Sequence, residues 1–156
     1  TRTEFLLGKQ LPYVGIAMIN YLVMVALAEW VFRVPITGSF AALTVGALVF
    51  SFIATGMGLL ASAVTRSQIA AMFLAMIGTL IPTLTYGGMI DPVTSLQGGA
   101  RIFGELYPSA YMITITRGVF NKALGFHELW PSLWPLLVTW PVITGVAILT
   151  LRKQEH

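Results

Sequence analysis

The chain has 156 residues, of which 56% are hydrophobic and only 10% are charged, and its mean hydropathy is +0.82. Soluble domains carry about a quarter charged residues, so this composition excludes a disordered chain and argues against a soluble domain. Cysteine is absent, which excludes disulfide bonds, thiolate metal sites and cysteine nucleophiles. Nine scattered Lys and Arg residues against six Asp and Glu residues predict no nucleic-acid partner. The sequence predicts an integral membrane protein.

Four apolar stretches are long enough to cross a bilayer and predict one all-α, polytopic transmembrane domain over residues 1–156. A helix of about 20 residues spans the hydrocarbon core of about 30 Å. The predicted spans are residues 11–32, 40–64, 69–89 and 133–151. The second and third spans are separated by one short polar turn, so we expect them to be antiparallel neighbours.

The distribution of Lys and Arg favours an orientation with both chain ends in the cytoplasm. With the N-terminus inside, the cytoplasmic side carries Arg2, Lys9, Arg66, Arg152 and Lys153. The outer side then carries Arg33, Arg101, Arg117 and Lys122. This small excess follows the positive-inside rule, so we expect a multi-pass protein of the inner (plasma) membrane with cytoplasmic termini.

The connection over residues 90–132 is predicted to form an outer helical cap, because it is too long for a turn and too apolar for disorder. Residues 111–124 have a helical period, and a second short helix is expected near residues 97–107. The predicted apolar face is Met112, Ile115, Val119 and Ala123, and the polar face is Thr114, Arg117 and Asn121. Such helices lie in the interface or re-enter the membrane. A simple cover over the spans and a substrate gate both explain them.

The residues before the first span predict a short separate helix. Thr1 and Glu4 have the spacing of a capping box, and Gly8 and Pro12 are expected to end the helix. This basic segment suits contact with the bilayer surface or with a cytoplasmic partner, and a solvated helix end explains the spacing equally well.

Small residues recur at four-residue spacing in the second span, in a row formed by Ala54, Gly58 and Ser62. Neighbouring rows are Ala47, Ser51 and Thr55 in the same span and Ala71, Ala75 and Thr79 in the third. Such rows allow helices to pack closely in lipid. The pattern indicates helix packing, with a neighbour either in this chain or in a second copy.

Pro82 lies inside the third span and predicts a kink, because proline removes one backbone hydrogen bond. Threonine hydroxyls nearby can satisfy the freed backbone groups, and Gly87 and Gly88 are expected to loosen the exit of the span. A moving gate and a fixed bend that leads into the cap explain this pattern equally well.

Few ionisable residues lie within the spans, and none forms a convincing catalytic set. Glu29 lies near a span end beside Trp30, which favours an interfacial position over a proton or cation site. Asn20 is more typical of a hydrogen bond between helices than of a substrate ligand. His127 and Glu128 lack an accompanying nucleophile, and the sequence contains no phosphate-binding loop. We therefore expect a chain that is no enzyme and binds no metal or cofactor itself.

Three stretches carry a resemblance to a known family. The first is RTEFLLGKQLPY at residues 2–13, and the second is YPSAY at residues 107–111 followed by TRGVFNKALGF at residues 116–126. Together they resemble the C-terminal half of an ABC-2 type transporter permease. TYGGMIDPV, residues 85–93, is most similar to the permease portion of the ribosome-associated ATPase subgroup and its stand-alone permease relatives.

The resemblance implies the membrane-spanning part of an exporter, paired with a second permease copy and served by a cassette ATPase that binds ATP and Mg. The residues expected to couple to the ATPase are Arg2, Glu4, Phe5, Lys9 and Arg66. The cap motif is Tyr107, Pro108, Tyr111, Arg117 and Gly118. Family members usually begin with a further span, so this chain is expected to be a fragment. The alternatives are an ion-coupled carrier or channel, an intramembrane enzyme, and a non-transporting anchor for an ATPase.

Overall fold

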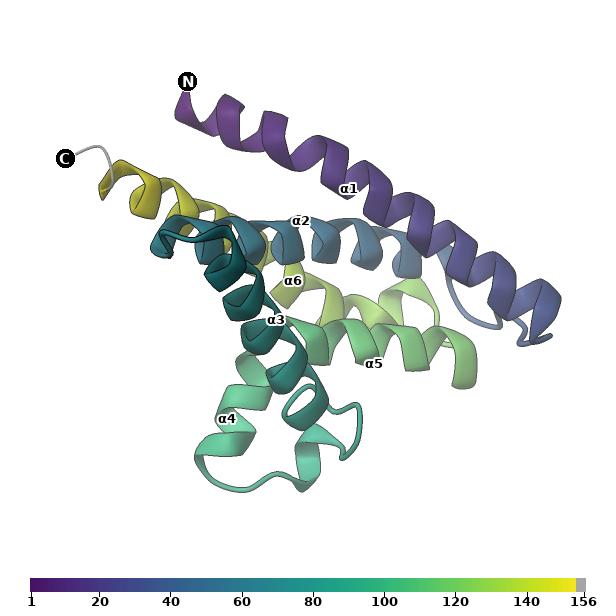
Figure 1. Cartoon of the computed structure of the whole chain (residues 1–156). Coiled ribbons are helices and arrows are strands. Elements are labelled where there is room, and N and C mark those ends of the chain that lie inside the picture. The colour runs from purple at the N-terminus through teal and green to yellow at the C-terminus, as the bar shows by residue number, and fades with distance from the viewer. Residues whose placement is uncertain (154–156) are drawn as a thin grey trace.

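The computed structural model describes residues 1–153, except for the side chains of Arg2, Arg152 and Lys153. Within these residues the chain is helical and contains no strand, which confirms the all-α class. Its elements are α1 (Arg2–Ala26), the π-helical turn η1 (Leu27–Val31), α2 (Phe40–Val64), α3 (Gln68–Thr85), the 3-10 turn η2 (Val93–Ser95), α4 (Gly99–Leu106), α5 (Pro108–Asn121) and α6 (Phe126–Lys153). Figure 1 shows α2 between α1 and α5, while α3 diverges from α2 toward α4.

Four stretches of helix are long and apolar enough to cross a membrane: Thr3–Val31, Phe40–Val64, Gln68–Thr85 and Phe126–Leu151. The second has the predicted bounds, because Ser39 caps it by accepting a hydrogen bond from the Ala42 amide at 3.2 Å. The helix of the third span ends at Thr85 rather than at residue 89, because the chain turns at Gly88 with a left-handed φ of 80°. The fourth begins at Phe126 rather than at residue 133, where Glu128 accepts a hydrogen bond from the Gly125 amide at 2.8 Å.

The N-terminal segment is continuous with the first span, so the prediction of a separate short helix is wrong. The capping box of Thr1 and Glu4 is present, but α1 runs on through Gly8 and Pro12. Pro12 removes only the hydrogen bond to the Gly8 carbonyl, and Gly8 leaves room for that carbonyl to tilt. The N-terminal segment and the first span therefore form one rod.

The hydrophobic core lies where α2, α5 and α6 meet. Its buried members are Ala42, Leu43, Val49, Ile53, Ile115, Val119, Leu129, Leu133 and Leu136. The predicted apolar face of the cap helix is confirmed at Ile115 and Val119, which are both fully buried. Ala123 was wrongly placed on that face, because the helix ends at Asn121 and Ala123 is exposed in a left-handed turn with φ 50°.

Helix α3 contacts α2 but packs loosely, since none of its residues, all within the described part, is buried. Ala54 and Ser62 are exposed, and a Cβ added at Gly58 would meet no described atom within 4 Å. The row therefore makes no close helix contact within this chain. Its role in packing against a second copy stays a prediction.

Candidate functional site

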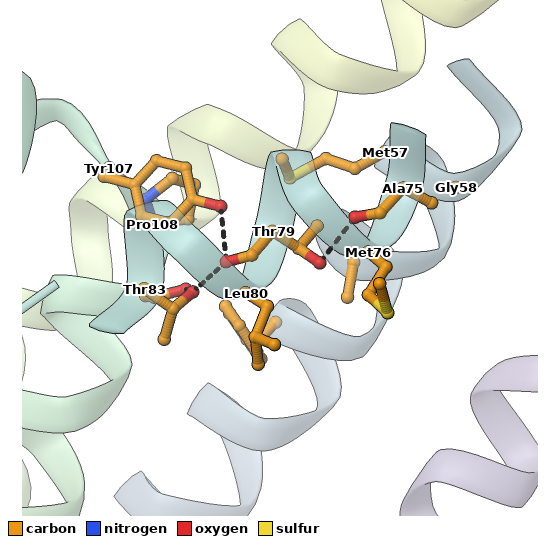
Figure 2. A pocket seen from close by; sticks show the side chains of 12 residues that line it. Met57, Gly58, Ala75, Met76, Thr79, Leu80, Thr83, Tyr107 and Pro108 are labelled. Atoms are coloured by element: carbon orange, nitrogen blue, oxygen red, sulfur yellow. Dashed lines mark hydrogen bonds between the residues drawn. The ribbon is translucent and has the colours of Figure 1, made fainter. Parts of the chain in front are cut away.

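The elements η2, α4 and α5, called the cap below, contact α3 next to Pro82. Pro82 has no amide hydrogen, so the Gly78 carbonyl one turn earlier lacks its usual donor. The Tyr107 hydroxyl supplies a donor in its place, at 3.1 Å from the Gly78 oxygen and 3.3 Å from the Thr79 oxygen. Figure 2 shows Tyr107 reaching the backbone of α3 at Thr79. Pro82, where a kink is predicted, and the cap motif, predicted as a separate feature, thus meet at one site.

Tyr107 is suited to this role because it remains a hydrogen-bond donor at neutral pH. It lies between α4 and α5, is 8% exposed, and burial raises the pKa of its phenol above the ordinary value. Its ring also stacks on Phe103 with the ring centroids 5.7 Å apart. The phenol is therefore held in place by α4 while its hydroxyl contacts α3.

Threonine and serine hydroxyls extend the contact along α3. Thr83 Oγ1 donates to the Thr79 carbonyl at 2.6 Å and shares a 2.9 Å hydrogen bond with Ser109 Oγ (Figure 2). Thr79 Oγ1 donates to the Ala75 carbonyl at 2.7 Å. These threonine hydroxyls add second hydrogen bonds to carbonyls one turn earlier in α3, and Ser109 gives the start of α5 a second link to α3.

Close backbone contact fixes the turn after α3. A Cβ at Gly87 would lie 2.5 Å from the Thr83 carbonyl oxygen, and a Cβ at Gly104 would lie 2.7 Å from that of Tyr86. Arg117 Nη2 donates to the Met89 carbonyl at 3.1 Å, which ties this turn to α5. In this structure Gly87 and Gly88 belong to a tightly packed turn between α3 and the cap.

The remaining members of the cap motif have structural contacts. Pro108 is buried at the first position of α5, where its missing amide hydrogen costs nothing. Tyr111 donates a hydrogen bond to the Glu105 carbonyl, which joins α5 to α4. A Cβ at Gly118 would lie 2.7 Å from Leu129 Cδ2, so the glycine permits α5 to approach α6 closely.

A crevice of about 450 Å³ lies between α2 and α3, and Tyr107 and Ser109 also line it. Gly58 of α2 lines this space together with Ala75 and Thr79 of α3 (Figure 2), and Ala54 of α2 also belongs to the lining. The lining, drawn from described residues, includes no charged side chain, and its threonine hydroxyls already donate to backbone carbonyls. The crevice suits an apolar occupant rather than an ion.

The residues predicted to couple to an ATPase lie toward one end of the molecule. The start of α1 and the turn between α2 and α3 share that end in Figure 1. Glu4, Phe5, Lys9 and Arg66 are exposed there, and the Lys9 ammonium lies 4.8 Å from the centre of the Phe5 ring. The side chain of Arg2, the fifth predicted residue, lies outside the described part.

Sequence reasoning missed Gln10, which fixes α1 on α2. Its side chain is 2% exposed, and its Nε2 donates to the Phe52 carbonyl at 3.3 Å. Leu6 and Val14, one turn before and one turn after, are also buried. This four-residue spacing was readable in the sequence and could have marked Gln10 as part of the buried face.

The polar residues on which the alternative functions depend do not gather into one site within the described part of the chain. Glu29 and Asn20 are exposed on the surface of the chain, and Glu29 lies in the π-helical turn near the end of its span. Glu128 accepts the Gly125 amide at the start of α6, which gives it a structural role. His127 beside it is exposed. The described residues thus place neither Glu29 nor Asn20 against a cavity of this chain.

Four apolar helices, of which α3 and α6 are joined by η2, α4 and α5, define a multi-pass helical membrane domain. The family profile described as ABC-2 family transporter protein matches residues 1–149, so the chain belongs to this family. The predicted resemblance to ABC-2 permeases is thereby confirmed. The closer similarity to the ribosome-associated ATPase subgroup stays a prediction.

The chain spans less than half the length of the curated relatives that it matches. The chain is 24% identical over 154 residues to the probable multidrug ABC transporter permease YbhR of Escherichia coli, covering 99% of this chain and 42% of that protein. It is 30% identical over 120 residues to the probable multidrug ABC transporter permease YbhS of the same organism, covering 77% and 32%. ABC transporter G family member 20 of Dictyostelium discoideum is 25% identical over 155 residues, covering 98% and 21%. No solved structure matches the chain.

Proposed function

We propose that the chain is the membrane-spanning permease part of an ATP-driven exporter, with ATP and Mg bound by a cassette ATPase in a partner subunit or fused domain. Membership of the ABC-2 family carries this proposal, and the four apolar helices support it. The names of YbhR and YbhS favour export of chemically varied small molecules. The uncharged crevice between α2 and α3 is consistent with apolar cargo.

The first step of the proposed mechanism is a push on the exposed end of α1. Because the described α1 continues through Gly8 and Pro12, a displacement at Phe5 is carried along the rod into the membrane. Gln10 is the buried contact that would pass part of this displacement to α2 through the Phe52 carbonyl. The turn that contains Arg66 offers the ATPase a second contact, at the junction of α2 and α3.

The second step is movement of α3 together with the cap. Tyr107 and Ser109 tie the cap to α3, while α3 itself is only loosely packed on α2. A change in the angle between α2 and α3 would therefore widen or close the crevice and move the cap with it. The row of Ala54, Gly58 and Ser62 would lose or gain contacts during this motion.

The proposed assembly contains two permease copies in the inner (plasma) membrane, each bound to a cytoplasmic cassette. The exposed apolar face of α3 offers surface for a second copy and for lipid. Cytoplasmic chain ends agree with the excess of basic residues at the end of the molecule that carries Lys9 and Arg66. A non-transporting anchor would share these contacts but would not move substrate.

Replacing Phe5 with serine in the full-length protein is expected to lower ATP-driven transport about tenfold or more. Phe5 is 61% exposed, and aromatic anchors supply much of the binding energy of protein interfaces. The matched control is Phe32→Ser, because Phe32 is 72% exposed at the other end of the same rod. The measurement is substrate efflux from proteoliposomes, with co-purification of the ATPase alongside. Equal effects of the two changes would contradict a coupling role for the α1 end.

A further inference from the structure

Two cavities on either side of α2 share Gly58 in their linings. One is the crevice of about 450 Å³ between α2 and α3 (Figure 2). The other, of about 270 Å³, lies between α1 and α2, where Lys9, Tyr13 and Thr55 also line it. Gly58 is half-buried, and a Cβ added to it would meet no described atom within 4 Å. The residue at the junction of the two cavities therefore puts no side chain between them.

The two cavities differ in charge. Lys9 belongs to the cavity between α1 and α2 and, among the described residues that line the two spaces, it is the one that is charged. Its ammonium lies 4.8 Å from the centre of the Phe5 ring. Glu4, the described carboxylate closest to Lys9 in the sequence, binds the N-terminal ammonium instead. The joined space is therefore cationic at the Lys9 end and apolar in the crevice.

The Lys9 ammonium lies at the depth of lipid headgroups. Helix α2 has 25 residues and is about 37 Å long, a few Å more than the hydrocarbon core of about 30 Å. Leu59, which lines the same cavity as Lys9, lies just over one turn before this helix ends at Val64. The Lys9 side chain reaches back toward Phe5, one turn nearer the start of α1, as a lysine does when its stem stays in the apolar layer. The crevice extends the other way, to Ala54 near the middle of α2.

We propose that one anionic phospholipid binds here, with its phosphate at Lys9 and one acyl chain running over Gly58 into the crevice between α2 and α3. Basic pockets between membrane helices bind acidic headgroups in this way. A zwitterionic headgroup would instead bring an ammonium beside Lys9, while Glu4 is already paired. The bound chain would fill the gap that the loosely packed α3 leaves against α2 and so hold the angle between them. The site does not depend on the transport function proposed above, because it is defined by the two cavities and one charge.

Stabilisation by a defined lipid tests the headgroup contact. Palmitoyl-oleoyl phosphatidylglycerol added to the full-length protein in detergent is expected to raise its Tm by about 5 °C, and phosphatidylcholine with the same chains should raise it much less. Lys9→Gln should remove most of this rise. The control is Lys122→Gln, because Lys122 is exposed at the end of α5. Equal rises with the two lipids, or a full rise in Lys9→Gln together with loss of ATPase co-purification, would overturn the proposal, and the second result would assign Lys9 to the ATPase contact.

Two further measurements test the path of the acyl chain. Leucine at position 58 fills the junction, so Gly58→Leu should keep the Tm of the lipid-free protein but lose most of the rise with phosphatidylglycerol. The control is Gly15→Leu, because Gly15 lies outside both linings and a Cβ there also meets no described atom within 4 Å. Phosphatidylglycerol with a diazirine near the end of one acyl chain should label Met76 or Leu80 of the unaltered protein, which remains informative if Gly58→Leu does not fold. A full rise in folded Gly58→Leu, or labelling confined to other helices, would overturn the proposal.

Discussion

Replacing Gly38 with alanine is expected to lower the Tm of the full-length protein by about 6–12 °C. A Cβ at this position would lie 2.6 Å from the Leu124 carbonyl oxygen and 2.8 Å from Val119 Cα, and backbone atoms cannot move aside as a flexible side chain can. The Gly38 amide also donates to the Val119 carbonyl at 2.8 Å. Overpacking of this kind costs about 3 kcal/mol, which corresponds to this Tm shift in a domain of about 150–250 residues.

The matched control for Gly38→Ala is Gly15→Ala. Gly15 lies inside α1, and a Cβ there would meet no described atom within 4 Å. Alanine favours the helix over glycine by about 0.5–1 kcal/mol, so this change should leave the Tm unaltered or raise it. Thermal unfolding in the same detergent compares the two variants. Equal Tm values for them would show that the α1–α2 linker does not pack against the end of α5.

Tyr107→Phe is expected to destabilise the protein by about 1–3 kcal/mol, because it leaves the Gly78 carbonyl without a donor. The same change in a Pro82→Ala background should cost only about 0.5 kcal/mol. Alanine at position 82 restores the amide hydrogen that bonds the Gly78 carbonyl, so the phenol is no longer needed there. The difference between the two costs, measured by thermal unfolding in a double-mutant cycle, reports the coupling between Pro82 and Tyr107.

Tyr13→Phe provides the control for this cycle, because Tyr13 is 64% exposed and its ring loses the same single hydroxyl. We expect it to change the Tm little in either background. A Tyr107→Phe cost that is identical with proline and with alanine at position 82 would contradict the site, since the phenol would then be serving some other contact. Transport by the folded Tyr107→Phe variant, compared with that of the unaltered protein, then reports whether transport requires the cap to move together with α3.

The four spans could be predicted because apolar length and local caps decide them. Ser39 caps α2, and the polar turn around Arg66 ends it, so both ends of this helix are local properties of the sequence. The continuity of α1 was missed because Gly8 and Pro12 each weaken a helix alone. Their four-residue spacing makes the pair tolerable, since the carbonyl opposite the proline belongs to a glycine.

The meeting of Pro82 with Tyr107 could not be predicted from spacing. The contact depends on the turn at Gly88 and on the path of the chain through α4. Neither segment has a regular repeat from which the sequence could show that Tyr107 lies next to Pro82. Whether α3 packs against the row at Ala54 and Gly58 depends likewise on the angle between α2 and α3. Small residues indicate that close packing is possible, but the crevice shows that α3 does not supply it here.

The central proposal is that a cassette ATPase, rather than an ion gradient, drives this membrane domain. The most direct measurement is efflux of a fluorescent apolar substrate from proteoliposomes that contain the full-length permease and its cassette. Changing the catalytic glutamate of the ATPase to glutamine should abolish ATP-driven efflux, while Glu29→Gln in this chain should leave it unchanged. Efflux that persists with the inactive ATPase and disappears with Glu29→Gln would contradict the account.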